Sequence, residues 1–174
     1  MAASGELAGQ WKLDPQASSV EFQVPHFWHA IKVRGRFERI DGEAVVGPDG
    51  TASGQLIIDA TSLNTKNKQR DKHLRSADFF DADKHPRVVV AIRQTALAAD
   101  GNLTAEGTLE AAGVTEPVTL TAQVTEATPD AITIQASLTV DRSRFGMTWS
   151  PLKMTAMQAT GNVTARFTRQ PASS

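Results

Sequence analysis

The sequence predicts an all-β protein of about eight antiparallel strands, and three observations support this fold class. Apolar and polar residues alternate along most of the chain, short turn motifs separate the alternating stretches, and one stretch alone departs from the pattern. Alternation with a period of two is typical of strands that bury one face, and links of hairpin length join antiparallel neighbours. The pattern by itself fits either a barrel or a sandwich of two sheets.

The first half of the chain contains a tail and three clear alternating stretches. Residues 1–9 are small and polar, so we expect a flexible tail before a single domain over residues 10–170, which opens with Trp11 to Pro15. The turn signals Asp41-Gly42 and Pro48-Asp49-Gly50 interrupt the alternation. The inner faces of the three stretches are Val20, Phe22, Val24 and His26; Ile31, Val33, Gly35 and Phe37; and Gly54, Leu56, Ile58 and Ala60.

The second half of the chain repeats the pattern at regular spacing. Its turns fall at residues 99–102 and at Thr128-Pro129-Asp130. The inner faces are Val88, Val90 and Ile92; Leu103, Ala105, Gly107 and Leu109; the even positions from Val114 to Val124; Ile132, Ile134, Ala136, Leu138 and Val140; and Met157, Ala159, Gly161, Val163, Ala165 and Phe167.

Ten of the predicted inward positions carry glycine or alanine, namely Gly35, Gly54, Ala60, Ala105, Gly107, Ala122, Ala136, Ala159, Gly161 and Ala165. An eight-stranded barrel is either filled by its own side chains or holds one small ligand. Small inward residues favour an apolar cavity for a hydrophobic guest. The alternative is that the glycines mark bends or bulges and the alanines face large partners.

The stretch Thr65 to Asp81 is the one that does not alternate. Its composition predicts a short helix over residues 67–76, with Thr65 or Asn67 as the N-cap, covering a barrel opening or a sheet edge. Between Lys66 and Arg75, five cations stand against the single anion Asp71: Lys66, Lys68, Arg70, Lys72 and Arg75. Arg70 and Arg75 are candidates for binding a phosphorylated head group. The alternative is a solvated face on which Arg75 pairs with Asp71 or Asp78.

Composition excludes several classes of protein. The formal net charge of −1 and a pI near 6.4 argue against nucleic acid or an anionic membrane as the main partner. There is no cysteine, and no apolar run approaches the roughly 18 residues that a spanning helix needs. Residues 1–11 lack the basic and apolar regions of a signal peptide, so the sequence as given predicts a soluble, cytoplasmic protein.

No catalytic or metal-binding motif is evident. His26 and His29 form the one close histidine pair, but the corner at Pro25 directs their rings apart and no third ligand is near. His73 has no nucleophile motif or carboxylate pair beside it, and a capping or pairing role on the helix is expected. The apolar segment Phe145 to Met154 is either a flap at the barrel mouth or a strand pair folded over the rim.

Several sequence blocks resemble the YceI-like family, a lipocalin-like group that binds polyisoprenoid lipids. The blocks are WKLDPQASSVEFQVPH from Trp11, KVRGRF from Lys32, NKQRDKHLRSADFFD from Asn67 with His85-Pro86 after it, GVTEPVTL from Gly113 and DRSRFGMTW from Asp141. They occur in the same order as in the family and span Trp11 to about Phe167. The segment His26 to Ile31 departs from the family by its two bulky aromatic residues, and many relatives carry a signal peptide and act outside the cytoplasm.

The resemblance implies an extended eight-stranded antiparallel barrel with one short helical insert, holding an isoprenoid or other long-chain amphiphile such as a quinone or polyprenyl phosphate. It implies no catalysis and no cofactor apart from such a lipid, and a homodimer is left open. The alternatives are a structural barrel filled by its own side chains and a redox enzyme acting on a bound quinone. The candidate ligand-binding residues are Phe22, Val24, His26, Trp28, Phe37, Ile58, Arg70, His73, Arg75, Phe79, Ile92, Leu109, Ile134, Ala136, Leu138, Phe145, Met147 and Trp149.

Overall fold

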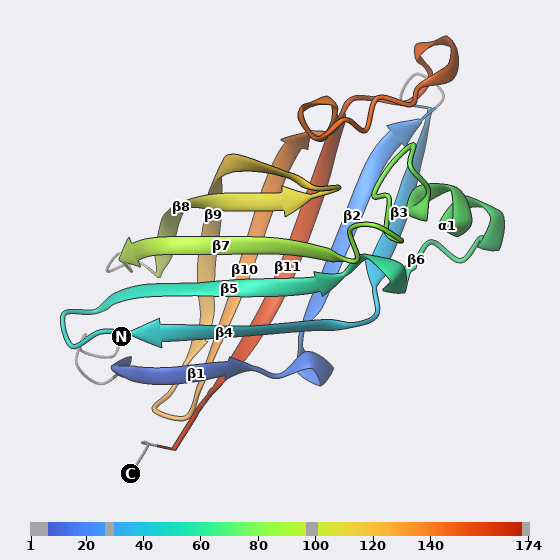
Figure 1. Cartoon of the computed structure of the whole chain (residues 1–174). Helices are drawn as coiled ribbons and strands as arrows, with labels where there is room; N and C mark the ends of the chain where they lie inside the picture. The colour runs from blue at the N-terminus through green and yellow to red at the C-terminus, as the bar shows by residue number, and fades with distance from the viewer. Residues whose placement is uncertain (1–6, 27–29, 97–100, 172–174) are drawn as a thin grey trace.

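The computed structural model describes residues 7–26, 30–96 and 101–171, and these residues form one antiparallel sheet with a single α-helix beside it (Figure 1). The strands are β1 (Gly9–Leu13), β2 (Ser19–His26), β3 (Ile31–Phe37), β4 (Ile40–Val46), β5 (Thr51–Asp59), β6 (Leu63–Asn64), β7 (Arg87–Ala96), β8 (Asn102–Ala111), β9 (Val114–Ala127), β10 (Ala131–Asp141) and β11 (Gln158–Arg169). The helix is α1 (Lys68–Arg75), and short 3₁₀ turns are η2 (Pro15–Ala17), η3 (Ala60–Ser62), η4 (Arg142–Phe145) and η5 (Pro151–Lys153).

Eight of the strands close into a barrel. Their order is β1-β4-β5-β7-β8-β9-β10-β11, and β1 pairs with β11 to complete the ring. Trp11 lies opposite Ala44 of β4 on one side and opposite Arg169 of β11 on the other. The eight-stranded antiparallel barrel expected from the sequence is therefore confirmed.

The remaining strands form an extension that we call the wing, which consists of β2, β3 and β6. β11 is long enough to pair with two strands along one edge: residues 167–169 pair with β1, and residues 160–164 pair with β2. β2 then pairs with β3, and β3 with β6. Figure 1 shows β2 and β3 continuing beyond the barrel strands.

The barrel and the wing separate where two strands are broken by turns that begin with aspartate. The carboxylate of Asp14 accepts from the amide of Gln16 at 3.2 Å, and the carboxylate of Asp59 accepts from the amide of Thr61 at 2.9 Å. Pro15 cannot donate to a ladder, so β1 must end there. The Asp14 amide still donates to Arg166 O at 2.8 Å, which keeps the two parts of the broken strand on the same edge of β11.

The core lies inside the barrel and continues under the wing. The rings of Phe22, Phe37 and Phe80 gather where the two meet, with centroids 5.4, 5.7 and 6.5 Å apart. Phe80 comes from the segment after α1, so this segment closes the wing end of the barrel. At the opposite side of the fold, Trp11 is 2% exposed and lies under the guanidinium of Arg169, 4.6 Å from its ring.

The helical insert forms within one residue of the predicted bounds. Asn67 is the N-cap, and its side chain accepts from the amide of Arg70 at 3.1 Å. α1 packs against β6, the edge strand of the wing, which fulfils one of the two predicted roles. The expected ion pairs of Arg75 with Asp71 or Asp78 are wrong. Asp71 is buried and accepts from the Thr65 amide at 2.8 Å, while Asp78 lies 2.8 Å from His73 Nε2.

Two inward glycines of the barrel provide a test of the packing. A Cβ at Gly107 would overlap the carbonyl oxygen of Ala91, next to a bulge between β7 and β8. A Cβ at Gly161 would have its nearest heavy atoms 3.9 Å away. We expect Gly107→Ala to lower the free energy of unfolding by about 1–3 kcal/mol through overpacking. Gly161→Ala should leave it unchanged or raise it by up to about 1 kcal/mol, because alanine restricts the unfolded chain. Urea unfolding followed by tryptophan fluorescence compares the two, and equal losses would contradict the close approach at Gly107.

Candidate functional site

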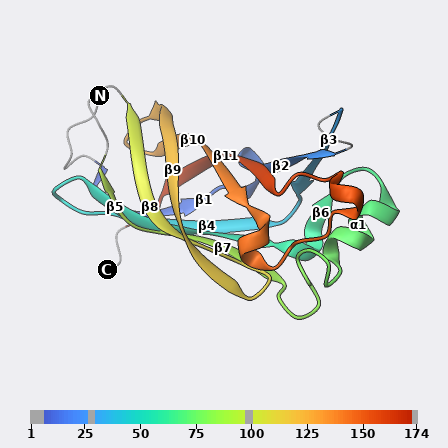
Figure 2. The ribbon, with the colours of Figure 1, turned by 90° about the horizontal axis from the view of Figure 1, so that it is seen from above.

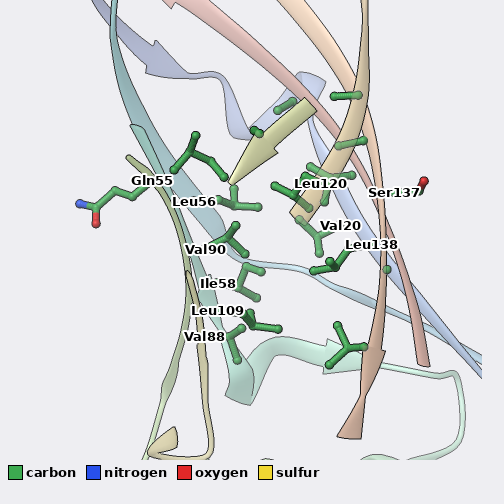
Figure 3. Close-up of a pocket in the computed structure, with 18 of the residues that line it drawn as sticks. Val20, Gln55, Leu56, Ile58, Val88, Val90, Leu109, Leu120, Ser137 and Leu138 are labelled. Carbon is green, nitrogen blue, oxygen red and sulfur yellow. The ribbon is translucent and has the colours of Figure 1, made fainter. Parts of the chain in front are cut away.

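The barrel encloses an apolar cavity of about 300 Å³. Figure 3 shows Leu56, Ile58 and Val90 on one wall directed toward Val20 and Leu138 on the other. Gln55 and Ser137 also border the cavity, but their side chains point away from it (Figure 3). For comparison, an engineered apolar cavity of about 150 Å³ remains dry and binds benzene. The cavity is therefore large enough for a hydrocarbon guest.

Small side chains keep this volume open. Seven of the ten small inward residues predicted from the sequence line the cavity: Gly54, Ala105, Ala122, Ala136, Ala159, Gly161 and Ala165. The other three fit the alternative interpretation, and so does Gly54 in part, because a Cβ there would lie 2.5 Å from Glu43 O beside a bulge between β5 and β7. A Cβ at Gly35 would overlap the Phe22 ring, Gly107 lies against the Ala91 carbonyl, and Ala60 is completely buried. Since protein interiors are normally close-packed, an unfilled apolar space of this size needs an explanation.

The two ends of the cavity differ in the side chains that line them. At the wing end the aromatic residues Phe22, Phe37 and Phe80 line it together with Phe145 and Met147 from the segment after β10. At the other end the lining residues include Ala52, Thr95, Leu103 and Ala122, none of which is aromatic. A bulky aromatic wall therefore faces the wing.

Arg142 is a buried cation at the wing end of the cavity. It is only 4% exposed, and its guanidinium donates to Ala156 O and Met147 O at 2.7 Å each and to Thr155 O at 3.1 Å. Burial lowers the pKa of Arg142, whereas the charge of Asp141 raises it. Arginine stays protonated in proteins, so this site holds a buried positive charge on main-chain dipoles. We call these three hydrogen bonds the Arg142 clamp.

The Arg142 clamp fixes the segment between β10 and β11. Asp141 starts the turn by accepting from the amide of Ser143 at 3.0 Å, and Gly146 ends it in the left-handed conformation at φ 78°. The same segment is tied to the wing, because the amide of Ala156 donates to Pro25 O at 2.9 Å. Of the two alternatives for this stretch, the strand pair is wrong, because residues 142–157 form the turns η4 and η5 and irregular backbone, and Phe145 and Met147 line the cavity.

The structure brings ten of the predicted ligand-binding residues to the cavity wall: Phe22, Phe37, Ile58, Ile92, Leu109, Ile134, Ala136, Leu138, Phe145 and Met147. Val24 and His26 lie farther along β2 in the wing and do not line it. Arg70, His73 and Arg75 lie on α1, also away from the wall. Trp28 and His29 lie outside the described residues.

Three residues predicted to contact the ligand, His73, Phe79 and Trp149, form a separate cluster outside the cavity instead. His73 packs edge-on against Trp149 and Phe79, with ring centroids 4.4 and 5.2 Å away, and the guanidinium of Arg142 is 5.6 Å from the Phe79 ring. None of His73, Phe79 and Trp149 lines the cavity. Arg70, expected near a head group, donates instead to Thr65 Oγ1 and Thr65 O at 2.8 Å each. The helical insert thus supports the cavity from outside.

Sequence reasoning missed several lining residues, and Arg142 above all. Leu56, Val88 and Val90 were assigned inward by alternation but not included in the site, and Phe80 was not assigned at all. Arg142 continues the even-numbered inner face of Ile132 to Val140 by one more step. Its even number could therefore have been used to predict that this cation faces inward.

The described cavity wall is suited to binding an apolar chain. Its side chains are almost all aliphatic or aromatic, and burying a polar group against them without a hydrogen-bond partner would be unfavourable. In the parts of the chain that the structure describes, no group of three or more His, Cys, Asp or Glu residues is arranged to hold a metal ion. Across the same residues, no helix has both the length and the apolar character to cross a membrane.

Comparison with known proteins identifies the family. The model of the YceI-like domain matches residues 11–168, which is nearly the whole barrel and wing. The chain belongs to the YceI-like domain family. Curated relatives of the chain include a UPF0312 protein of Vibrio cholerae, 34% identical over 87 residues, and one of Staphylococcus aureus, 35% identical over 94 residues. These alignments cover 49% and 52% of this chain and 44% and 54% of the relatives, so the chain spans about half the length of the curated relatives it matches.

Solved structures share the YceI-like fold. BcnA of Burkholderia cenocepacia superposes with a TM-score of 0.80 at 20% identity, over 88% of this chain and 98% of that one. A polyisoprenoid-binding domain from Saccharophagus degradans, described as implicated in plant cell wall breakdown, superposes with a TM-score of 0.75 at 19% identity, over 92% and 98% of the two chains. At these identities the likeness establishes the fold.

The Arg142 clamp yields a testable prediction for the YceI-like barrel. Arg142→Met should lower the free energy of unfolding by about 3 kcal/mol or more, because buried carbonyls lose hydrogen bonds to a charged donor. The matched control is Arg144→Met, which removes an exposed arginine that pairs with Glu116 at 3.3 Å and should change stability by about 1 kcal/mol or less. Chemical denaturation measures both variants, and equal losses would show that the clamp contributes little.

Proposed function

We propose that this protein binds the hydrocarbon tail of a polyisoprenoid lipid inside the barrel and so stores, sequesters or transports that lipid in an aqueous compartment. The observation that carries this function is the unfilled apolar cavity of about 300 Å³. Ligand sites are typically concave, apolar and largely preformed. The family of the chain, and the polyisoprenoid-binding description of the Saccharophagus degradans domain, support an isoprenoid over other apolar guests.

Burial of the tail is the main favourable term in the proposed binding. Each methylene removed from water contributes up to about 0.8 kcal/mol, and ordering the flexible chain offsets part of this gain. A quinone or phosphate head group cannot satisfy its acceptors on aliphatic walls, so it belongs at an end of the cavity rather than in the middle. We propose binding alone, with no chemical step.

The rival function of a structural barrel fits the cavity less well. A barrel that serves only as a scaffold gains stability by filling its interior, yet seven positions here carry glycine or alanine beside the empty space. Extraction of the purified protein with organic solvent followed by mass spectrometry separates the two functions. A stoichiometric isoprenoid supports binding, and its absence after expression in an isoprenoid-producing host would contradict it.

A pair of adjacent substitutions tests the cavity as the ligand site. Ala136 lines the cavity, whereas the next residue, Ser137, is exposed and points away from it (Figure 3). Ala136→Trp adds nine heavy atoms to the wall, and if the guest loses about three buried methylenes, binding of a long-chain isoprenoid quinone should weaken by about 50-fold. Ser137→Trp adds the same side chain outside and should leave affinity unchanged. Circular dichroism checks that both variants keep their strand content. Equal affinities would place the ligand elsewhere.

The length of the isoprenoid tail provides an independent test. A strand of ten residues such as β8 spans about 33 Å, and strand tilt makes the barrel shorter than this. Affinity should therefore rise with each added isoprene unit and then reach a plateau once the cavity is full. Titration with quinones of increasing tail length, measured by tryptophan fluorescence, follows the dependence. A tailless quinone that binds as tightly as a long one would show that the head group alone is recognised.

A further inference from the structure

The charges of this nearly neutral protein are unevenly distributed. The whole sequence has 18 lysines and arginines against 19 aspartates and glutamates. Residues 30–38, 66–86 and 150–154 belong to the wing end and carry ten lysines and arginines against five acids, Glu38, Asp71, Asp78, Asp81 and Asp83. The excess of five positive charges at this end contrasts with the net charge of −1 of the whole sequence. Figure 2 shows the three segments gathered at one end of the molecule, around β3, α1 and the connection after β10.

The most distant part of this end also exposes large apolar side chains. Among the described residues, the exposed large hydrophobic side chains are Leu152, Ile31 and Val45, at 80%, 50% and 51% exposure. Ile31 begins β3 and Leu152 lies in η5, whereas Val45 lies on β4 of the barrel. Lys32 and Lys153 follow the two apolar residues directly and are exposed, and the described residues include no ion pair for either lysine. We call Ile31, Lys32, Leu152 and Lys153 the wing tip.

The wing tip is held in place by hydrogen bonds rather than by burial of its apolar side chains. His26 Nδ1 lies 2.6 Å from Thr155 Oγ1, which joins the end of β2 to the segment after η5. Ser150 Oγ donates to Thr155 O at 2.7 Å and closes a short loop around Leu152. Leu152 and Lys153 have φ angles of 53° and 56°, a conformation that is unfavourable for residues with a Cβ. The fold thus maintains an unfavourable backbone that leaves a leucine in solvent.

We infer that the wing tip docks on the surface of an anionic lipid bilayer. Leucine and isoleucine side chains at an exposed corner can enter the boundary between head groups and acyl chains, while adjacent lysines meet the lipid phosphates. The charge of the wing end favours this partner, since an anionic surface attracts basic segments within a Debye length. This docking goes beyond the proposed function, because it assigns a surface outside the cavity and does not require a bound guest.

The connection after β10 links this surface to the cavity. Phe145 and Met147 line the cavity, Leu152 lies at the wing tip, and the Arg142 clamp holds the intervening segment at Met147 and Thr155. A bilayer bound at the wing tip is therefore in contact with the same short segment that lines the wing end of the cavity. This places the cavity near the membrane from which a lipid would be taken.

Vesicle co-sedimentation of the full chain tests the docking. The vesicles contain either phosphatidylcholine alone or an equimolar mixture with phosphatidylglycerol, at low and at high salt. Each lysine near an anionic surface raises partitioning about fivefold. Lys32→Gln with Lys153→Gln should therefore lower binding to the anionic vesicles by about 30-fold. The matched control is Lys12→Gln with Arg93→Gln, which removes two exposed cations of the barrel wall.

The apolar part of the wing tip is tested by Leu152→Ser against Val45→Ser. Both remove an exposed side chain, and only the first should weaken binding to anionic vesicles. Ala136→Trp should bind vesicles like the wild type even where it fails to bind lipid in the cavity, which separates docking from the proposed function. Equal binding by the wing-tip and control variants, or no preference for anionic vesicles, would overturn the docking. Binding of poly-glutamate through the wing-tip lysines without vesicle binding would also overturn it, in favour of an acidic protein partner.

Discussion

The division of one edge of β11 between β1 and β2 is the constraint on which the rest of the structure depends. Residues 167–169 pair with β1 and close the barrel, while residues 160–164 pair with β2 and start the wing. This division requires the chain to break between β1 and β2 without leaving the edge. The turn that begins at Asp14 provides the break, and the hydrogen bond from the Asp14 amide to Arg166 keeps the chain in position. The barrel can therefore close with eight strands and still present three strands outside it.

The cavity and the wing are connected through packing at the wing end. Phe22 and Phe37 belong to wing strands, yet they line the cavity together with Phe80. The barrel interior is therefore closed by residues that are not part of the closed ring. Fifteen buried residues form one continuous cluster that includes positions of the barrel strands, of the wing and of the segments after α1 and β10, and Phe22 and Phe80 pack against it.

The sequence predicted most of the local structure and the inner face of the barrel. Alternation identified Ile58, Leu109 and Leu138 as inward because a strand has a strict period of two, and Asn67 was a recognisable N-cap. The division into barrel and wing was not predicted, because strand pairing between distant segments is decided by tertiary packing and not by local pattern. Val24 and His26 lie on the same face of β2 as Phe22 but farther along the strand, in the wing. Periodicity therefore predicted that they line the cavity, and in the structure they do not. Arg142 was missed because a charged side chain at an inward position is favourable only where hydrogen-bond acceptors surround it. Its acceptors include the carbonyl oxygens of Thr155 and Ala156, which belong to a segment without alternation, so the sequence pattern could not place them.

The acceptors of the Arg142 clamp are all main-chain oxygens, and this has a consequence for how the protein can change. A salt bridge depends on two side chains, so a substitution of either partner breaks it. Here the partners of Arg142 are present whatever residues occupy positions 147, 155 and 156. The segment between them can therefore vary in sequence, and even in the residue at its tip, while its two ends stay fixed relative to the barrel. Homologous proteins could in this way acquire different outer surfaces on an unchanged lipid-sized interior, and the same segment is the natural place to graft a new recognition loop onto the barrel.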